Sequence, residues 1–201
     1  MNNEGRLTPL PFLGLGLLAL LAGMWVGLLR LGWDWPILQP TLPISHGPLM
    51  IAGFLGTVIG IERAVALQAL SPTRYRWTFL GPALTGLGAL LLIIGLAGGI
   101  GPLLITLCSL NLVIVFGVMV RRQPAIFAGL MAAAAWLWLI GNGLWLIGRP
   151  VHMVVIWWSG FLILTIAGER LELNRVLRLT TRIQSLFLER SGCLVLACWL
   201  P

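Results

Sequence analysis

The sequence predicts an all-α integral membrane protein, a polytopic helical bundle of about six transmembrane helices. The 201 residues are 59% hydrophobic and only 9% charged, so the chain lacks the polar residues that coat a water-soluble domain. Several apolar runs reach the roughly 20 residues that a helix needs to cross a hydrocarbon core. Apolar and polar residues do not alternate with period two, which argues against a membrane β-barrel.

Six apolar segments are expected to span the bilayer, with ends defined to within a few residues. Five of them cover residues 10–31, 44–70, 78–96, 124–147 and 151–173, and the fourth span follows a tight turn expected over 98–102 and ends near Val120. The first is too long for the apolar core of a signal peptide, so we expect it to be retained as a helix. Residues 1–175 then form the transmembrane bundle. Residues 176–201 are expected to form an interfacial amphipathic helix and a short apolar tail, which resembles a truncated or frameshifted seventh span.

Arginine placement predicts the orientation of every span. The net charge of +7 comes from 13 arginines without any lysine. Most arginines follow the even-numbered spans, whereas the opposite loops hold Arg30 and Arg149 alone. The positive-inside rule therefore predicts a cytoplasmic N-terminus, and we expect a bacterial inner membrane protein. The basic residues are not interleaved with aromatics as single-strand binding requires, so the predicted partner is the lipid bilayer rather than nucleic acid.

The two histidines are the first candidate site residues. His46 begins the second expected span and His152 begins the sixth, so both are predicted near the outer surface. A histidine in a membrane span is expensive to bury and points to a functional site. The alternative is that each ring lies among the lipid headgroups at a helix end.

A stripe of small and polar residues continues from His46 along one face of the second span. At helical spacing it comprises Met50, Gly53, Thr57 and Gly60. Such a stripe lets a neighbouring helix, or a flat cofactor, approach the backbone closely. The sequence leaves open whether these residues pack helices alone or also hold a cofactor.

The second and sixth spans share a layout that indicates a parallel four-helix pseudo-repeat. Matching Gly53 to Gly160 aligns two Gly-Phe-Leu runs and brings His46 next to the position of His152. The same alignment superposes two Glu-Arg pairs at the expected inner ends of the spans, Glu62 with Arg63 and Glu169 with Arg170. These residues are candidate ion pairs, or long side chains that reach the cytoplasmic interface.

A histidine within His46-Gly47-Pro48-Leu49-Met50, recurring on the sixth span, resembles the catalytic subunit of haem–copper oxidases. By its general character the chain is also similar to the NnrS family of haem- and copper-containing membrane proteins, which are linked to nitric oxide metabolism. The resemblance implies that His46 is an axial haem ligand, with Met50 nearby, and that His152 matches a copper ligand. An alternative is that the two histidines ligate one haem together, because both are expected at a similar depth on the outer side.

The departures from the oxidase pattern are substantial. No His-His pair is present, the sole tyrosine is Tyr75 on the expected cytoplasmic side, and the sixth span lacks the oxidase residues after its histidine. One spare histidine does not make a copper site, because copper requires several imidazoles. We therefore expect a haem-binding membrane protein of respiratory or nitric oxide metabolism that is not a complete oxidoreductase on its own. It would work with a partner membrane subunit or as a homo-oligomer.

Two other function classes stay open. A small transporter or channel would use the stripe of the second span as a path, with Asn111 and Asn142 as its polar residues. No acidic residue is expected at mid-membrane, where coupled transporters place one. A membrane assembly subunit without chemistry of its own would need neither histidine.

Overall fold

The computed structural model describes residues 7–96 and 98–176, and only the backbone of the last two of these. Within these ranges, six helices are long and apolar enough to cross a membrane. They are Leu10–Arg30, Pro48–Leu70, Arg76–Ile94, Ile100–Arg122, Ile126–Leu146 and Val151–Asn174. The predicted fold class is confirmed, and the chain is an integral membrane protein. The interfacial helix and apolar tail expected over 177–201 lie outside the described residues.

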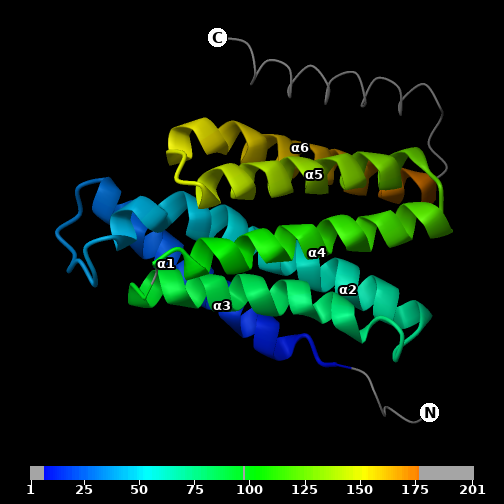
Figure 1. Ribbon diagram of the computed structural model, residues 1–201, viewed down its shortest axis with the longest axis horizontal. Coiled ribbons are helices and arrows are strands. Elements are labelled where there is room, and N and C mark those ends of the chain that lie inside the picture. The colour runs from blue at the N-terminus through cyan, green and yellow to red at the C-terminus, as the bar shows by residue number, and fades with distance from the viewer. Residues whose placement is uncertain (1–6, 97, 177–201) are drawn as a thin grey trace. The chain divides into compact units, whose positions relative to one another are not determined.

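The chain divides into two compact units between Leu112 and Val113. The elements of the first unit are α1 (Leu10–Arg30), η1 (Leu42–Ser45), η2 (Pro48–Gly56), α2 (Thr57–Leu70), η3 (Arg76–Phe79), α3 (Leu80–Ile94) and the first part of α4 (Ile100–Arg122). The second unit contains the rest of α4, α5 (Ile126–Leu146) and α6 (Val151–Val176). Figure 1 labels the α-helices of both units.

The sequence predicts one continuous helix for the second span, but the structure shows three successive types of helix there. It begins with the 3-10 turn η1, continues as the π-helix η2 and becomes α-helical only from Thr57. Two residues explain where the change falls. Pro48 opens η2 and has no N–H to donate. At the other end, the Thr57 hydroxyl donates to the Gly53 carbonyl at 2.6 Å, so a side chain competes for a backbone acceptor where the π-helix ends.

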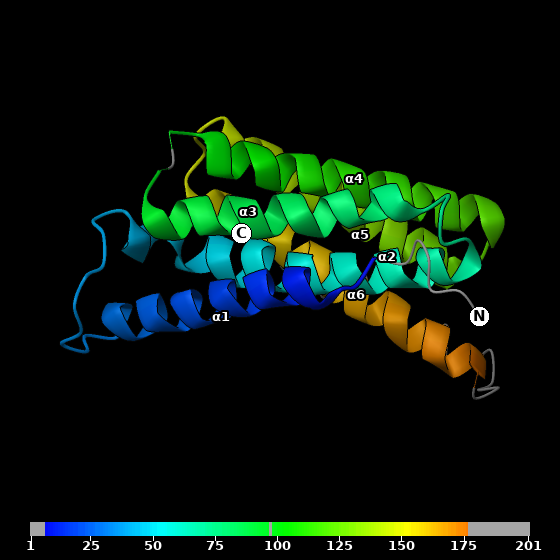
Figure 2. The ribbon, with the colours of Figure 1, turned by 90° about the horizontal axis from the view of Figure 1, so that it is seen from below.

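Small residues bring the helices of the first unit together. Gly53 of η2 lies where α1 and α3 meet, and a Cβ built on it would be 2.9 Å from the Ala19 Cβ and 3.0 Å from the Ala89 Cβ. One turn further on, Thr57 packs against Gly16 of α1. In Figure 2, α1, α2 and α3 run beside one another, as their contacts require. The absence of a side chain at Gly53 therefore sets how closely three segments approach.

The second unit is built on the antiparallel hairpin of α5 and α6, seen along its length in Figure 1. Gly148, with a φ of +86°, makes the turn between them because a left-handed backbone favours glycine. The rings of Trp138 and Phe161 stack across the hairpin with centroids 4.8 Å apart. Both side chains are fully buried, so aromatic packing joins the two helices.

Candidate cofactor site around His46

His46 is half-buried at the end of η1, where the chain turns into the π-helix η2. Its ring contacts α1: the Nδ1 atom lies 2.8 Å from the carbonyl oxygen of Gly23. A carbonyl oxygen can only accept, so Nδ1 carries the proton and donates it. In a neutral imidazole this hydrogen bond selects the tautomer in which Nε2 keeps its lone pair, the form in which histidine binds a metal or haem iron.

A second glycine of α1 makes room for the ring. A Cβ built on Gly27 would lie 3.1 Å from His46 Cε1 and 3.3 Å from Nδ1, tighter than about nine in ten real Cβ contacts. Gly23 and Gly27 are one helical turn apart, so the imidazole lies along a stretch of bare α1 backbone. The position of the ring thus depends on both glycines, one as hydrogen-bond acceptor and one as open space.

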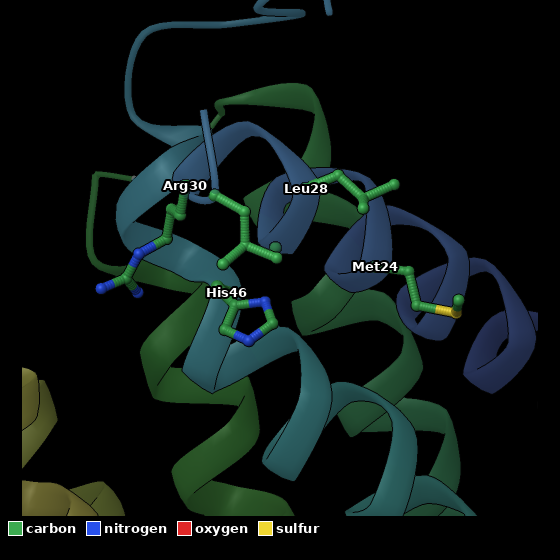
Figure 3. Close-up of a pocket in the computed structure, with 6 residues that line it drawn as sticks. Met24, Leu28, Arg30 and His46 are labelled. Carbon is green, nitrogen blue, oxygen red and sulfur yellow. The ribbon is translucent and has the colours of Figure 1, made fainter. Parts of the chain in front are cut away.

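The ring forms part of the wall of a groove of about 620 Å³. This volume is within the roughly 300–1,000 Å³ range of small-molecule and cofactor sites. Apart from His46, the lining comes from α1 and the residue after it: Met24, Gly27, Leu28, Arg30 and Leu31. Figure 3 shows the His46 ring beside α1, with the Arg30 side chain on one side of it and Met24 further along the helix. The groove therefore combines an apolar wall, one imidazole and one exposed cation.

Met50 lies close to this site without lining the groove. A Cβ built on Gly23 would be 2.7 Å from the Met50 sulfur, so the thioether packs against the residue whose carbonyl binds His46. The other members of the expected stripe lie deeper in the unit. Gly53 contacts α1 and α3, Thr57 contacts α1, and Gly60 packs against Pro82 of α3 at 3.2 Å from its built Cβ.

His152 is exposed in the first turn of α6, in the second unit. The two spans of the expected repeat therefore differ at their histidine ends, since α6 is α-helical from Val151 whereas the second span begins with η1 and η2. The aligned glycines of the two spans, Gly53 and Gly160, both make close contacts. Gly53 contacts α1 and α3, and a Cβ built on Gly160 would lie 2.8 Å from Leu137 Cδ1 of α5.

The two Glu-Arg pairs also differ in their surroundings. Arg63 is buried, and its guanidinium donates at 2.7 Å to the carboxylate of Glu62, which is exposed. In α6, Glu169 is half-buried and Arg170 is exposed. The Glu62–Arg63 pair thus holds a buried cation within the first unit, whereas Arg170 lies on the surface.

The donors around His46 suit haem better than a bare metal ion. Within the described residues, no three His, Cys, Asp or Glu side chains lie close enough to hold one ion. Copper bound by protein alone needs several imidazoles or thiolates, and His46 supplies one. Haem brings four nitrogen ligands of its own, so that one imidazole meets its protein-side requirement for an axial ligand.

Both asparagines suggested for a transport path take part in local packing. Asn142 of α5 is fully buried and its Oδ1 accepts a hydrogen bond of 2.9 Å from the Trp158 indole of α6. Asn111 of α4 lies against α3, where its Oδ1 would be 2.7 Å from a Cβ built on Gly81.

Sequence reasoning missed the α1 side of the site. The partner of His46 is a backbone carbonyl, which has no sequence signature, and the groove is lined mainly by α1. One available signal was the spacing of Gly23 and Gly27, four residues apart, which is typical of close approach between membrane helices.

Nearly the whole chain matches a protein-family model. Residues 9–200 match the family model described as Domain of unknown function (DUF8744). No curated protein and no solved structure matches the chain.

Proposed function

The chain belongs to the DUF8744 family, and on the geometry of the His46 groove we propose that it is a haem-binding membrane protein with His46 as axial ligand. The observation that carries the proposal is the hydrogen bond from His46 Nδ1 to the Gly23 carbonyl. This bond orients the ring and, in the neutral imidazole, leaves Nε2 as the atom whose lone pair would bind the iron.

The groove supports the same proposal by its composition. Its apolar walls suit a macrocycle, and exposed Arg30 supplies a cation for a carboxylate at the cofactor's edge. Bound there, haem would supply a centre that takes up and releases one electron. The residues of the chain would bind and orient it: His46 as ligand, Gly23 as the acceptor that holds the ring, and Gly27 as the space beside it.

The test is a spectrum of the full chain. The protein is expressed with a haem supply, purified in detergent, and its reduced-minus-oxidised spectrum recorded. We expect Soret and α bands at about one haem per chain, lost in His46→Ala because the axial ligand is removed. A wild-type protein without either band would contradict the proposal.

Three further variants localise the site. His152→Ala removes the other histidine, which is exposed in α6, and should retain the bands. Gly27→Leu fills the space beside the ring and should lower haem occupancy while keeping the ligand. Gly143→Leu makes the same change where nothing lies within 4 Å of the built Cβ, and should leave occupancy unchanged. Bands that vanish in His152→Ala but survive in His46→Ala would assign haem elsewhere.

A further inference from the structure

A second pocket lies at the C-terminal end of α1, on the segment that leads from this helix to η1. Its volume is about 430 Å³, within the roughly 300–1,000 Å³ range of small-molecule sites. The lining residues are Leu29, Arg30, Gly32, Trp33, Asp34, Trp35, Ile37 and Pro43. The pocket therefore combines one cation, one anion and two indoles with an otherwise apolar wall.

Contacts with α1 hold the wall of this pocket in place. The Trp25 indole donates a hydrogen bond of 3.3 Å to the Pro36 carbonyl. The ring centroids of Trp25 and Trp35 are 4.2 Å apart, and the Trp33 ring meets Trp35 edge to face at 5.8 Å. The backbone N–H of Trp33 also donates to the Leu28 carbonyl at 3.2 Å. The wall is thus built from packed rings that are tied to the helix.

The two charged residues of the pocket are open to a ligand. Arg30 and Asp34, the only aspartate of the chain, are both exposed, and among the described residues neither has an ion-pair or side-chain hydrogen-bond partner. A guanidinium binds a phosphate through two parallel hydrogen bonds, and a carboxylate accepts hydrogen bonds from an ammonium group. The face of an indole attracts the same cation. The pocket therefore suits a ligand that carries both a phosphate and an ammonium group.

The place of the pocket along the span indicates the source of this ligand. A helix of 21 residues is about 32 Å long at 1.5 Å per residue, close to the thickness of a hydrocarbon core. The residues at the end of α1 accordingly lie at the level of the lipid headgroups, where tryptophans gather in membrane proteins. Ile37 of the lining is 64% exposed and offers an apolar surface to an acyl chain.

We propose that this pocket binds the headgroup of phosphatidylethanolamine, a zwitterionic phospholipid with a primary ammonium group. Arg30 binds the phosphate, and the ammonium group lies between the Asp34 carboxylate and the Trp33 ring. The proposal does not depend on haem, because Asp34 and Trp33 lie outside the His46 groove. Arg30 lines both sites, and its five N–H donors allow it to contact a carboxylate and a phosphate.

The test uses two lipids with the same acyl chains and different headgroup charge. Delipidated full-length protein in detergent is titrated with dioleoyl phosphatidylethanolamine and with dioleoyl phosphatidylglycerol, and bound lipid is counted by native mass spectrometry. We expect Asp34→Asn to bind phosphatidylethanolamine about threefold more weakly, the value of one exposed ion pair. The same variant should bind phosphatidylglycerol as tightly as before or more tightly, because the lost carboxylate repels an anionic headgroup. Arg30→Gln should weaken both lipids.

Matched variants separate the site from general effects. Trp33→Leu should weaken phosphatidylethanolamine about threefold. Trp136→Leu, which changes a tryptophan of α5 that is equally exposed, should not. Arg149→Gln changes an exposed arginine between α5 and α6 and should leave both lipids unaffected. Haem bands should persist in Asp34→Asn, so that loss of lipid binding and loss of haem are separate results.

Three results would overturn the proposal. The first is phosphatidylethanolamine binding that is unchanged in Asp34→Asn, and the second is equal weakening of both lipids in that variant. The third concerns glycerophosphoethanolamine, the water-soluble form of the headgroup. We expect that it does not displace the lipid at equal concentration, because it lacks the acyl chains that contact Ile37. Displacement would identify a soluble ligand instead of a membrane lipid.

Discussion

Replacing Gly53 by alanine tests whether the first unit depends on close approach at this residue. The new Cβ would lie 2.9 Å from the Ala19 Cβ of α1 and 3.0 Å from the Ala89 Cβ of α3. Carbon atoms pack best at about 3.5–4.0 Å. Both neighbours are methyl groups fixed to backbone, so neither can rotate away. Relief requires α1 or α3 to move by roughly half an ångström or more.

The expected change in the free energy of unfolding is the sum of two opposing effects. Overpacking a well-packed site costs about 1–3 kcal/mol of unfolding free energy. Alanine in place of glycine in a helix recovers up to about 1 kcal/mol. We therefore expect Gly53→Ala to lower the free energy of unfolding by about 1–2 kcal/mol, and Tm by about 2–8 °C for a chain of this length. Thermal unfolding of the purified protein in detergent, followed by circular dichroism, measures the change.

Two comparisons make the reasoning refutable. Gly14→Ala adds the same methyl in α1 with nothing within 4 Å, so Tm should stay level or rise. Adding Ala89→Gly to Gly53→Ala removes one of the two overlapping methyls and should restore part of the lost stability. If Gly53→Ala and Gly14→Ala unfold at the same temperature, the close approach does not limit packing here.

Two further predictions concern the α5–α6 hairpin. Trp158→Phe removes the indole donor of the 2.9 Å hydrogen bond to Asn142, leaves a buried acceptor, and should lower the free energy of unfolding by about 1–3 kcal/mol in denaturant titration. Gly168→Ala places a Cβ against Met131 Cγ and should lower Tm. Gly143→Ala adds a methyl group on α5 where nothing lies within 4 Å, and it should not lower Tm. An equal fall in Tm for Gly168→Ala and Gly143→Ala would rule out the Met131 contact as the cause.

The six spans were predictable because the bilayer sets their length and composition whatever the tertiary contacts. The fourth, expected to follow a turn over 98–102 and to end near Val120, is observed as Ile100–Arg122, so the last three residues of the expected turn already belong to the helix. The π-helix at Pro48–Gly56 was not predictable in this way. A run of nine residues has too few turns for its periodicity to distinguish a π-helix from an α-helix. The type of helix depends instead on tertiary and side-chain contacts, here the Thr57 hydroxyl on the Gly53 carbonyl and the packing of Gly53 against α1 and α3.

Part of the candidate site was likewise predictable from the sequence, and part of it was not. His46 was identifiable from its residue type, since an imidazole in an apolar run is rare. Its acceptor, the Gly23 carbonyl, was not, because every residue carries a carbonyl. The internal repeat likewise predicted equivalent histidines, whereas His46 is half-buried against α1 and His152 is exposed. Similar residues at similar places in two spans do not acquire the same surroundings, because neighbouring helices supply those surroundings.

The π-helix and the orientation of His46 are linked. In an α-helix, His46, Gly53 and Gly60 would follow one face of the span. Bonding from i to i+5 puts more residues into each turn, so η2 rotates the residues ahead of it relative to those in α2. Gly60 can then face Pro82 of α3 while the His46 ring faces the Gly23 carbonyl of α1. Irregular helix of this kind is common at functional sites, and here it begins two residues after the imidazole.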